Sequence, residues 1–229
     1  SIIPSRILKF LIKSAYNRAD IIVAVSDGVK QELTCEFGIK SELITVLHNP
    51  INIAHINRLA QEDVEDEWFS GSIPKIINMG RLTEAKGQWH LIRAFAEIRS
   101  KVPCKLAIIG TGELKGYLEN LVSELGLHHE IRFLGWQENP YKYISKSTVF
   151  VFPSLWEALP YALIEAMACG IPVISADCKH GPREVIGDNE YGILVRPMDG
   201  WDAGALEPLS GSEENLRDQV LLLLSNENM

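Results

Sequence analysis

Short apolar segments alternate with longer amphipathic segments along most of the chain. A short run of apolar residues is typical of a strand that is buried on both faces of a sheet. Apolar residues that recur every three or four positions indicate a helix with one buried face. From residue 74 onward the pattern predicts six strands, over residues 75–79, 105–109, 131–134, 148–152, 173–175 and 192–195.

A helix is predicted after each of these strands. The helices cover residues 88–99, 114–125, 140–146, 161–169, 183–186 and 213–224. This alternation predicts an α/β fold with a doubly wound, mainly parallel, Rossmann-like sheet that has helices on both faces. Ligands of such sheets bind beyond the carboxyl ends of the strands, so the residues that follow each strand are the candidates for function.

Residues 1–50 form a separate group of predicted elements. They comprise a helix over 4–18, a strand over 21–25, a helix over 26–37 and a strand over 43–47. Residues 51–72 are predicted to be a linker, because five of the six residues 62–67 are acidic and such a run is usually solvated. We therefore expect a short group of elements over 1–50 and a Rossmann-like domain over 73–229, joined by the linker.

The predicted helix over residues 4–18 is amphipathic. Its basic face holds Arg6, Lys9 and Lys13, and its apolar face holds Leu8, Leu11, Ile12 and Ala15. This pattern fits a helix that packs on a missing part of its own domain, and it also fits a helix that lies on a membrane surface. The chain opens on Ser1 and closes on Met229 soon after an apolar run, so we expect it to be a piece of a longer polypeptide.

Composition narrows the class of protein. The chain has 22 basic and 30 acidic side chains, which gives a net charge of −8, and 46% of its residues are hydrophobic. This is a globular composition, and the negative charge disfavours nucleic acid as a partner. No apolar run approaches the roughly 20 residues that span a bilayer. The cysteines form no CxxC pair and the histidines have no metal-ligand spacing, which favours a reducing, cytoplasmic location without a metal framework.

Glycines and cations follow two of the predicted strands. Gly110 and Gly112 precede a helix, where backbone amides could meet an anion. They do not form a dinucleotide fingerprint, because Lys115 stands where its third glycine would be. Arg81 and Lys86 flank the loop after the strand over 75–79. Two cations beside a helix N-terminus suit a diphosphate, although exposed basic residues on a loop are the simpler interpretation.

Two glutamates lie eight residues apart, on either side of Pro160. Glu165 falls in an apolar helix pattern, where a charge needs a partner. Such a carboxylate could accept hydrogen bonds from the vicinal diol of a ribose. Glu157 falls in the preceding loop, where the simplest interpretation is a solvated acid.

Several motifs occur together in a fixed order. They are Ala19-Asp20 to Ser26, Val46 to Pro50, Gly80-Arg81-Leu82 with Lys86-Gly87, Gly110 to Leu114, Phe133-Leu134-Gly135, and Pro153 to Gly170, which contains Glu157 and Glu165. In this order they resemble the retaining, GT-B-fold glycosyltransferases of family 4, also called glycosyl transferases group 1. The resemblance covers residues from about 15 to 225. It implies that residues 1–50 are the C-terminal remnant of the family's acceptor-binding N-terminal domain.

The resemblance implies roles for these residues. Arg81 and Lys86 would neutralise the diphosphate of a nucleotide-sugar, Glu165 would hold the ribose, and Glu157 would orient the donor sugar. It also places Gly80, Gly110, Gly112, Phe133, Leu159 and Pro160 at the donor site. The Gly110–Gly112 turn would lie near the phosphates, and the backbone around Phe133 would lie near the base. Family members often have Gly-Phe-Gly where this chain has Ala158-Leu159-Pro160, and Pro160 has no N–H to offer a sugar.

The resemblance also implies a reaction. Residues 73–229 would bind a UDP- or GDP-linked sugar, and the parent protein would transfer it with retention to a glycan or lipid-linked acceptor in cell-surface polysaccharide or glycoconjugate synthesis. No DxD triplet occurs, consistent with side-chain cations rather than a metal at the diphosphate. We expect no permanent cofactor, a cytoplasmic location that could be peripheral at the membrane, and little transfer by this piece alone. The alternatives are a GT-B-fold nucleotide-sugar epimerase and a non-catalytic sugar-nucleotide-binding module.

Overall fold

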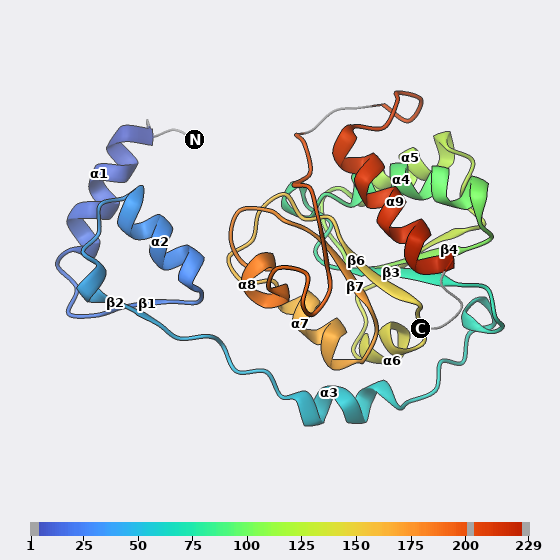
Figure 1. Ribbon diagram of the computed structural model, residues 1–229, viewed down its shortest axis with the longest axis horizontal. Helices are drawn as coiled ribbons and strands as arrows, with labels where there is room; N and C mark the ends of the chain where they lie inside the picture. The colour runs from blue at the N-terminus through green and yellow to red at the C-terminus, as the bar shows by residue number, and fades with distance from the viewer. Residues whose placement is uncertain (1–4, 201–203, 226–229) are drawn as a thin grey trace. The chain divides into compact units, whose positions relative to one another are not determined.

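The protein is described here by a computed structural model of residues 5–200 and 204–225, with only the backbone given for residues 5, 6 and 8. The chain divides into two compact units, Ser1–Ile51 and Asn52–Met229 (Figure 1). The elements of the first unit are α1 (Ser5–Tyr16), β1 (Ile22–Ala24), α2 (Asp27–Cys35), a 3-10 turn (Ser41–Leu43) and β2 (Ile44–Val46). Strands β1 and β2 pair in parallel, and Ala24, Ile39 and Ile44 form a small core beneath α1 and α2.

The predicted amphipathic helix is α1. Ile12 packs against the small core of the first unit, whereas Phe10 is 69% exposed and Ile7 and Leu11 are about half exposed. Lys9 Nζ lies 3.9 Å from Glu36 Oε2, and it also lies over the ring of Phe37. The side chains of Arg6 and Leu8, which the sequence assigns to the two faces, lie outside the described atoms. Among the described residues, no helix has the length and apolar character needed to cross a membrane.

The second unit contains a six-stranded parallel sheet in the order β5-β4-β3-β6-β7-β8. The strands are β3 (Lys75–Met79), β4 (Lys105–Ile109), β5 (Ile131–Gly135), β6 (Val149–Phe152), β7 (Val173–Ala176) and β8 (Ile193–Val195). This confirms the predicted α/β fold with a doubly wound parallel sheet. Successive strands run outward from β3 on one side and from β6 on the other. The neighbouring pair β3 and β6 is therefore the topological switch point, beside which ligands bind in such sheets.

Helices cover both faces of this sheet (Figure 1). One face carries α4 (Gln88–Lys101), α5 (Lys115–Glu124) and α9 (Gly211–Ser225), and the other carries α6 (Tyr141–Ser145), α7 (Tyr161–Ala168) and α8 (Pro182–Ile186). Alternate side chains of each central strand enter the two cores, as in β3, where Ile76 faces the first and Ile77 the second. Both faces of the central strands β3, β4, β6 and β7 are buried, which explains why these strands appear in the sequence as continuous, mainly apolar runs.

Part of the predicted linker over residues 51–72 is instead a helix. Helix α3 (Ile53–Ala60) is capped by Asn52, whose side chain accepts a hydrogen bond from the His55 amide at 2.9 Å. The helix packs against α6 and α7. Ile56 and Ala60 are buried. The acidic run that suggested a solvated linker begins only after this helix. Within that run Asp66 caps a 3-10 turn (Glu67–Phe69) and lies 2.5 Å from Arg132.

A buried charged cluster joins α4 to α9. Glu213 accepts from Arg93 Nε at 2.9 Å and lies 2.8 Å from His90 Nδ1, and all three residues are at most 3% exposed. Arg93 also donates to the backbone carbonyls of Glu207 and Pro208. The cluster fixes the last helix on the sheet through paired charges, in addition to its apolar face.

Candidate functional site

The loops that follow β3 and β4 are held together by backbone hydrogen bonds. The Gly80 amide donates to the Ile109 carbonyl at 3.0 Å, and the Leu82 amide donates to the Thr111 carbonyl at 2.9 Å. The Gly110 amide donates to the carbonyl of Gly135, at the end of β5, at 2.8 Å. Gly110 has φ +138°, and a Cβ atom at this position would lie 1.9 Å from the Gly80 carbonyl oxygen. Only glycine allows these two backbones to approach so closely.

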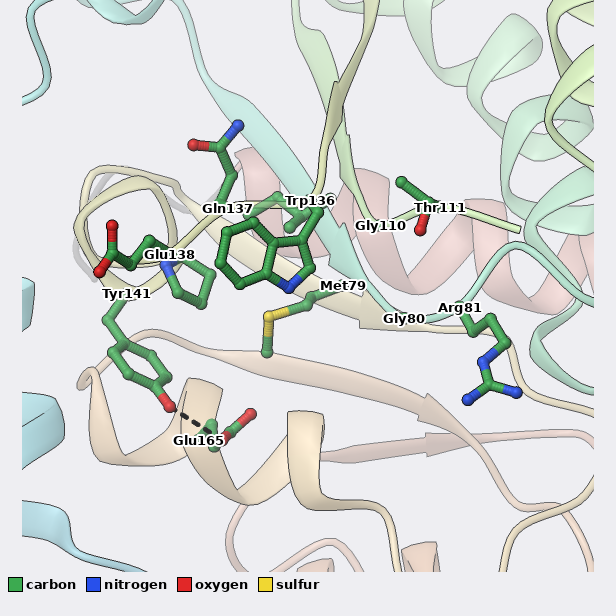
Figure 2. A pocket seen from close by; sticks show the side chains of 12 residues that line it. Met79, Gly80, Arg81, Gly110, Thr111, Trp136, Gln137, Glu138, Tyr141 and Glu165 are labelled. Carbon is green, nitrogen blue, oxygen red and sulfur yellow. Dashed lines mark hydrogen bonds between the residues drawn. The ribbon is translucent and has the colours of Figure 1, made fainter.

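A pocket of about 580 Å³ opens at the carboxyl ends of β3, β4 and β5 (Figure 2). The residues that line it come from the ends of these strands, the loop after β5, and helices α6 and α7. They are Met79, Gly80, Arg81, Ile109, Gly110, Thr111, Trp136, Gln137, Glu138, Pro140, Tyr141 and Glu165. Four of the residues singled out in the sequence, Gly80, Arg81, Gly110 and Glu165, are therefore brought together.

The two ends of this pocket differ in chemistry. Figure 2 shows the Arg81 guanidinium on one side and the rings of Trp136 and Tyr141 on the other. The backbone carbonyl of exposed Arg81 accepts a hydrogen bond from Gln88 Nε2 at 3.1 Å, which fixes the loop that carries it. The pocket thus offers a permanent cation for an anionic group and an aromatic surface for a planar, apolar group.

Glu165 has the partner that its apolar helix demands. The Tyr141 hydroxyl donates to Glu165 Oε1 at 2.9 Å, from α6 to α7. Burial raises the pKa of Glu165, and the hydrogen bond from Tyr141 partly opposes this. Burial and the neighbouring carboxylate raise the pKa of Tyr141 to about 12, so the phenol keeps its proton and acts as a donor.

Lys86 and Glu157 lie beside the pocket and contact each other. Lys86 Nζ is 2.5 Å from Glu157 Oε1. Their loops are also joined by a hydrogen bond from the Leu155 amide to the Ala85 carbonyl at 2.9 Å. A Cβ atom at Gly80 would lie 3.6 Å from the Lys86 side chain, so Lys86 packs beside Gly80, which lines the pocket, although Lys86 itself does not line it. Glu157, the expected loop acid, is mostly buried.

The other predicted site residues do not line the pocket. Gly112 packs against Leu82, whose carbonyl oxygen would lie 2.3 Å from a Cβ atom there. Phe133 is half-buried and packs against the core on the α4 side of the sheet. Leu159 and Pro160 are buried, and a Cβ atom at Gly181 would lie 2.7 Å from Pro160 Cδ. In this structure these residues shape the loops around the pocket.

Sequence reasoning assigned no role to the aromatic residues of the pocket. Trp136 is 73% exposed and directly follows Gly135 at the end of β5, so its position at a strand end was the available signal. Tyr141 had no such signal. It faces Glu165 only because α6 packs beside α7, which is a tertiary contact.

Comparison with known proteins identifies the family. The family model described as "Glycosyl transferases group 1" matches residues 61–227, and the one described as "Glycosyltransferase Family 4" matches residues 3–55. The uncharacterized glycosyltransferase MJ1059 of Methanocaldococcus jannaschii is 37% identical over 98% of this chain and 60% of its own length. The N-acetylgalactosamine-N,N'-diacetylbacillosaminyl-diphospho-undecaprenol 4-alpha-N-acetylgalactosaminyltransferase of Campylobacter jejuni is 39% identical over 83% of this chain and 50% of its own length.

Solved structures show the same fold. The Anabaena protein HepE, crystallised with UDP and glucose, has a TM-score of 0.78 and 21% identity over 98% of this chain and 59% of its own. A glycosyltransferase from Rickettsia africae has a TM-score of 0.76 and 21% identity over 97% of this chain and 57% of its own. The chain thus spans less than two thirds of the length of these relatives. It belongs to the glycosyl transferases group 1 and has the GT-B fold of that family.

Proposed function

We propose that the pocket binds the nucleoside diphosphate of a UDP- or GDP-linked sugar, and that the protein transfers this sugar, with retention of configuration, to a glycan or lipid-linked acceptor. The observation that carries the proposal is the pocket itself. It lies at the carboxyl ends of the strands and brings together a cation at Arg81, a carboxylate at Glu165 and an aromatic ring at Trp136. These are the three chemistries that a diphosphate, a ribose and a base require.

The diphosphate belongs at the Arg81 end of the pocket. A guanidinium can donate two parallel hydrogen bonds to phosphate oxygens. Lys86 has three N–H donors, so it can keep its contact with Glu157 and still donate to a phosphate. Together these cations would stabilise the charge that develops on the leaving nucleotide, which is the task that a divalent metal performs in other enzymes. We therefore propose transfer that requires no metal ion.

The nucleoside belongs at the other end. Glu165 is the carboxylate of the pocket that lies on a helix and is oriented by a neighbour, so it would accept hydrogen bonds from the ribose hydroxyls. Trp136 is largely exposed within the pocket and would stack on the base. Glu157, next to Lys86, would orient the donor sugar, while Pro160 offers it no N–H.

The names of relatives support an acceptor class. One is a 4-alpha-N-acetylgalactosaminyltransferase whose name includes N,N'-diacetylbacillosaminyl-diphospho-undecaprenol, in which a sugar is linked through a diphosphate to a lipid. Another, from Salmonella typhimurium, is a lipopolysaccharide 1,6-galactosyltransferase that is 30% identical to this chain. We propose an acceptor of this kind, a cytoplasmic location, and peripheral contact with the membrane through the basic residues and the exposed apolar residues of α1.

Calorimetric titration with UDP, GDP and ADP tests the donor site. We expect one nucleotide to bind the wild-type chain and to lose most of its affinity in the Arg81→Ala/Lys86→Ala variant. The matched control is Lys101→Ala/Lys115→Ala, which removes the same charge from exposed positions at α4 and α5. Equal losses in both variants, or no binding of any nucleotide to the folded chain, would contradict the proposal. We expect the chain alone to transfer little sugar to an acceptor.

A further inference from the structure

One oxygen of the Glu165 carboxylate is engaged by a neighbouring side chain of the pocket. Tyr141 donates to Oε1 at 2.9 Å, and Figure 2 shows the other carboxylate oxygen directed away from Tyr141. Both residues line the pocket, and they come from different helices. The hydrogen bond therefore fixes which oxygen is presented to a ligand.

We propose that Tyr141 is a positioning residue that holds Glu165 so that the pocket selects ribonucleoside diphosphates over their 2′-deoxy counterparts. This inference rests on the proposed donor site and names the class of nucleotide that the site takes. Thymidine diphosphate contains deoxyribose, so sugars linked to it would bind this pocket more weakly than sugars linked to a ribonucleoside diphosphate.

The position of Glu165 explains why it needs a neighbour. The residue lies on an apolar helix, and burial disfavours its charged form. The thiol of Cys169, at the end of the same helix, is neutral at pH 7 because burial and the Glu165 charge raise its pKa to about 11. Arg81 and Glu138 also line the pocket. A phenol donor beside the carboxylate favours the ionised form, which can accept hydrogen bonds from a diol.

The hydrogen bond between Tyr141 and Glu165 also explains how the pocket would discriminate between ribose and deoxyribose. A site built to bond a substrate hydroxyl rejects the analogue that lacks it, because the polar group of the site is then left without its partner. A carboxylate that could rotate would adapt to a deoxyribose by turning toward water. Tyr141 restrains this rotation, so the missing hydroxyl leaves the oriented oxygen unpaired.

The test compares UDP with 2′-deoxy-UDP, and GDP with 2′-deoxy-GDP, by calorimetry. We expect the wild-type chain to bind the ribonucleotide about tenfold more tightly, as is typical of a hydrogen bond to a charged group. In Tyr141→Phe this ratio should fall to about threefold or less, and in Glu165→Gln it should approach one. Tyr143→Phe is the matched control. Its ring lies on the same helix but packs against Phe69, with centroids 5.1 Å apart, and the ratio should not change.

The dependence of this ratio on pH shows whether Tyr141 acts by positioning the Glu165 carboxylate or only by packing. Loss of the Tyr141 donor should raise the pKa of Glu165. As the pH is lowered, the preference for the ribonucleotide should therefore begin to weaken at a higher pH in Tyr141→Phe than in the wild type. Titration of the nucleotide phosphate cancels, because it is common to both members of each pair. A folded Tyr141→Phe variant with the wild-type ratio and pH profile would overturn the inference and leave the donor site intact. If the wild type bound no nucleotide at all, the proposed function would fail as well.

Discussion

Lys86 and Glu157 meet across two loops that lie 71 positions apart in the chain, with Nζ and Oε1 separated by 2.5 Å. The Glu157 side chain is only 9% exposed and that of Lys86 is 25% exposed, so both charges are largely removed from water. Each strand end next to the switch point, after β3 and after β6, thus contributes one partner. The pair fixes the distance between the loops that flank the proposed diphosphate site.

Removing the charge of one partner of this pair should lower the free energy of unfolding more than removing both charges together. In Lys86→Met the Glu157 carboxylate would stay nearly buried without its cation, and we expect a loss of about 2 kcal/mol in the free energy of unfolding. In Lys86→Met/Glu157→Gln most of this loss should be recovered. Urea denaturation of the two single variants and the double variant measures the coupling. Additive effects would show that the two side chains do not stabilise each other.

The close approach of the loops after β3 and β4 predicts a sharp response to a methyl group. Gly110→Ala would place a Cβ atom 1.9 Å from the Gly80 carbonyl oxygen, so the loops must separate. We expect a loss of more than about 2 kcal/mol in stability together with loss of nucleotide binding. Gly116→Ala is the control, because nothing lies within 4 Å of that position on α5. It should be neutral or stabilising by about 0.5–1 kcal/mol, and thermal unfolding compares the two.

The buried charges of α4 and α9 predict a dependence of stability on pH. Burial raises the pKa of Glu213, but hydrogen bonds from His90 and Arg93 outweigh it and leave this pKa below the ordinary 4.5. The stabilisation is therefore complete above about pH 4.5 and is lost as the pH falls through the lower pKa of the folded protein. We expect Glu213→Gln to cost about 3 kcal/mol at pH 7, and less below pH 4.

An exposed ion pair supplies the comparison for Glu213. Lys115 and Glu119 lie 3.5 Å apart on α5 and are about half exposed. Glu119→Gln should change the free energy of unfolding by less than about 0.5 kcal/mol at any of these pH values. Urea denaturation between pH 3.5 and 7 measures both variants, and similar losses in the two would contradict the role of burial.

For Glu165, unlike Glu213, we expect removal of the charge to stabilise the protein at pH 7. Because burial raises its pKa, the ionised carboxylate is less favourable in the folded chain than in the unfolded chain, and this cost is present at pH 7. Glu165→Gln keeps an oxygen that can accept from Tyr141 and should raise the melting temperature by about 2 °C at pH 7. The difference should shrink as the pH falls toward the pKa of Glu165 and the wild type becomes protonated. A lower melting temperature at pH 7 would show that the charge is stabilised by the fold.

The exposed side of α1 predicts binding to anionic membranes. We expect the chain to sediment with vesicles that contain anionic lipid, and Arg6→Gln/Lys9→Gln/Lys13→Gln to reduce the bound fraction severalfold. Phe10, which is 69% exposed, should contribute by burial, so Phe10→Ser should reduce binding as well. The charge-matched control is Arg99→Gln/Lys101→Gln/Lys115→Gln, on α4 and α5. Equal losses in the control would indicate an effect of net charge alone.

The sequence predicted the strands and most of the helices, because their signal is local. Strands β3 and β4 were predicted with their observed bounds, since a strand buried on both faces is a continuous apolar run. Helix α3 is not among the predicted elements, although it has apolar residues at helical spacing and Asn52 as a cap, because the acidic run that follows it is typical of a solvated linker. What such local patterns omit is which helix packs beside which.

The candidate site also contains features that local sequence patterns predict and features that depend on tertiary packing. The sequence alone placed Arg81, Gly110 and Glu165 at strand ends or on a helix near them, and parallel strands end at one edge of a sheet, so their convergence followed from topology. Only the tertiary structure decided that Lys86 pairs with Glu157 and that Tyr141 holds Glu165. These contacts join residues that are 71 and 24 positions apart, and they depend on side-chain distances of a few ångströms. Periodicity along a chain determines which face of an element is buried, whereas distances between elements are set by how the whole core packs.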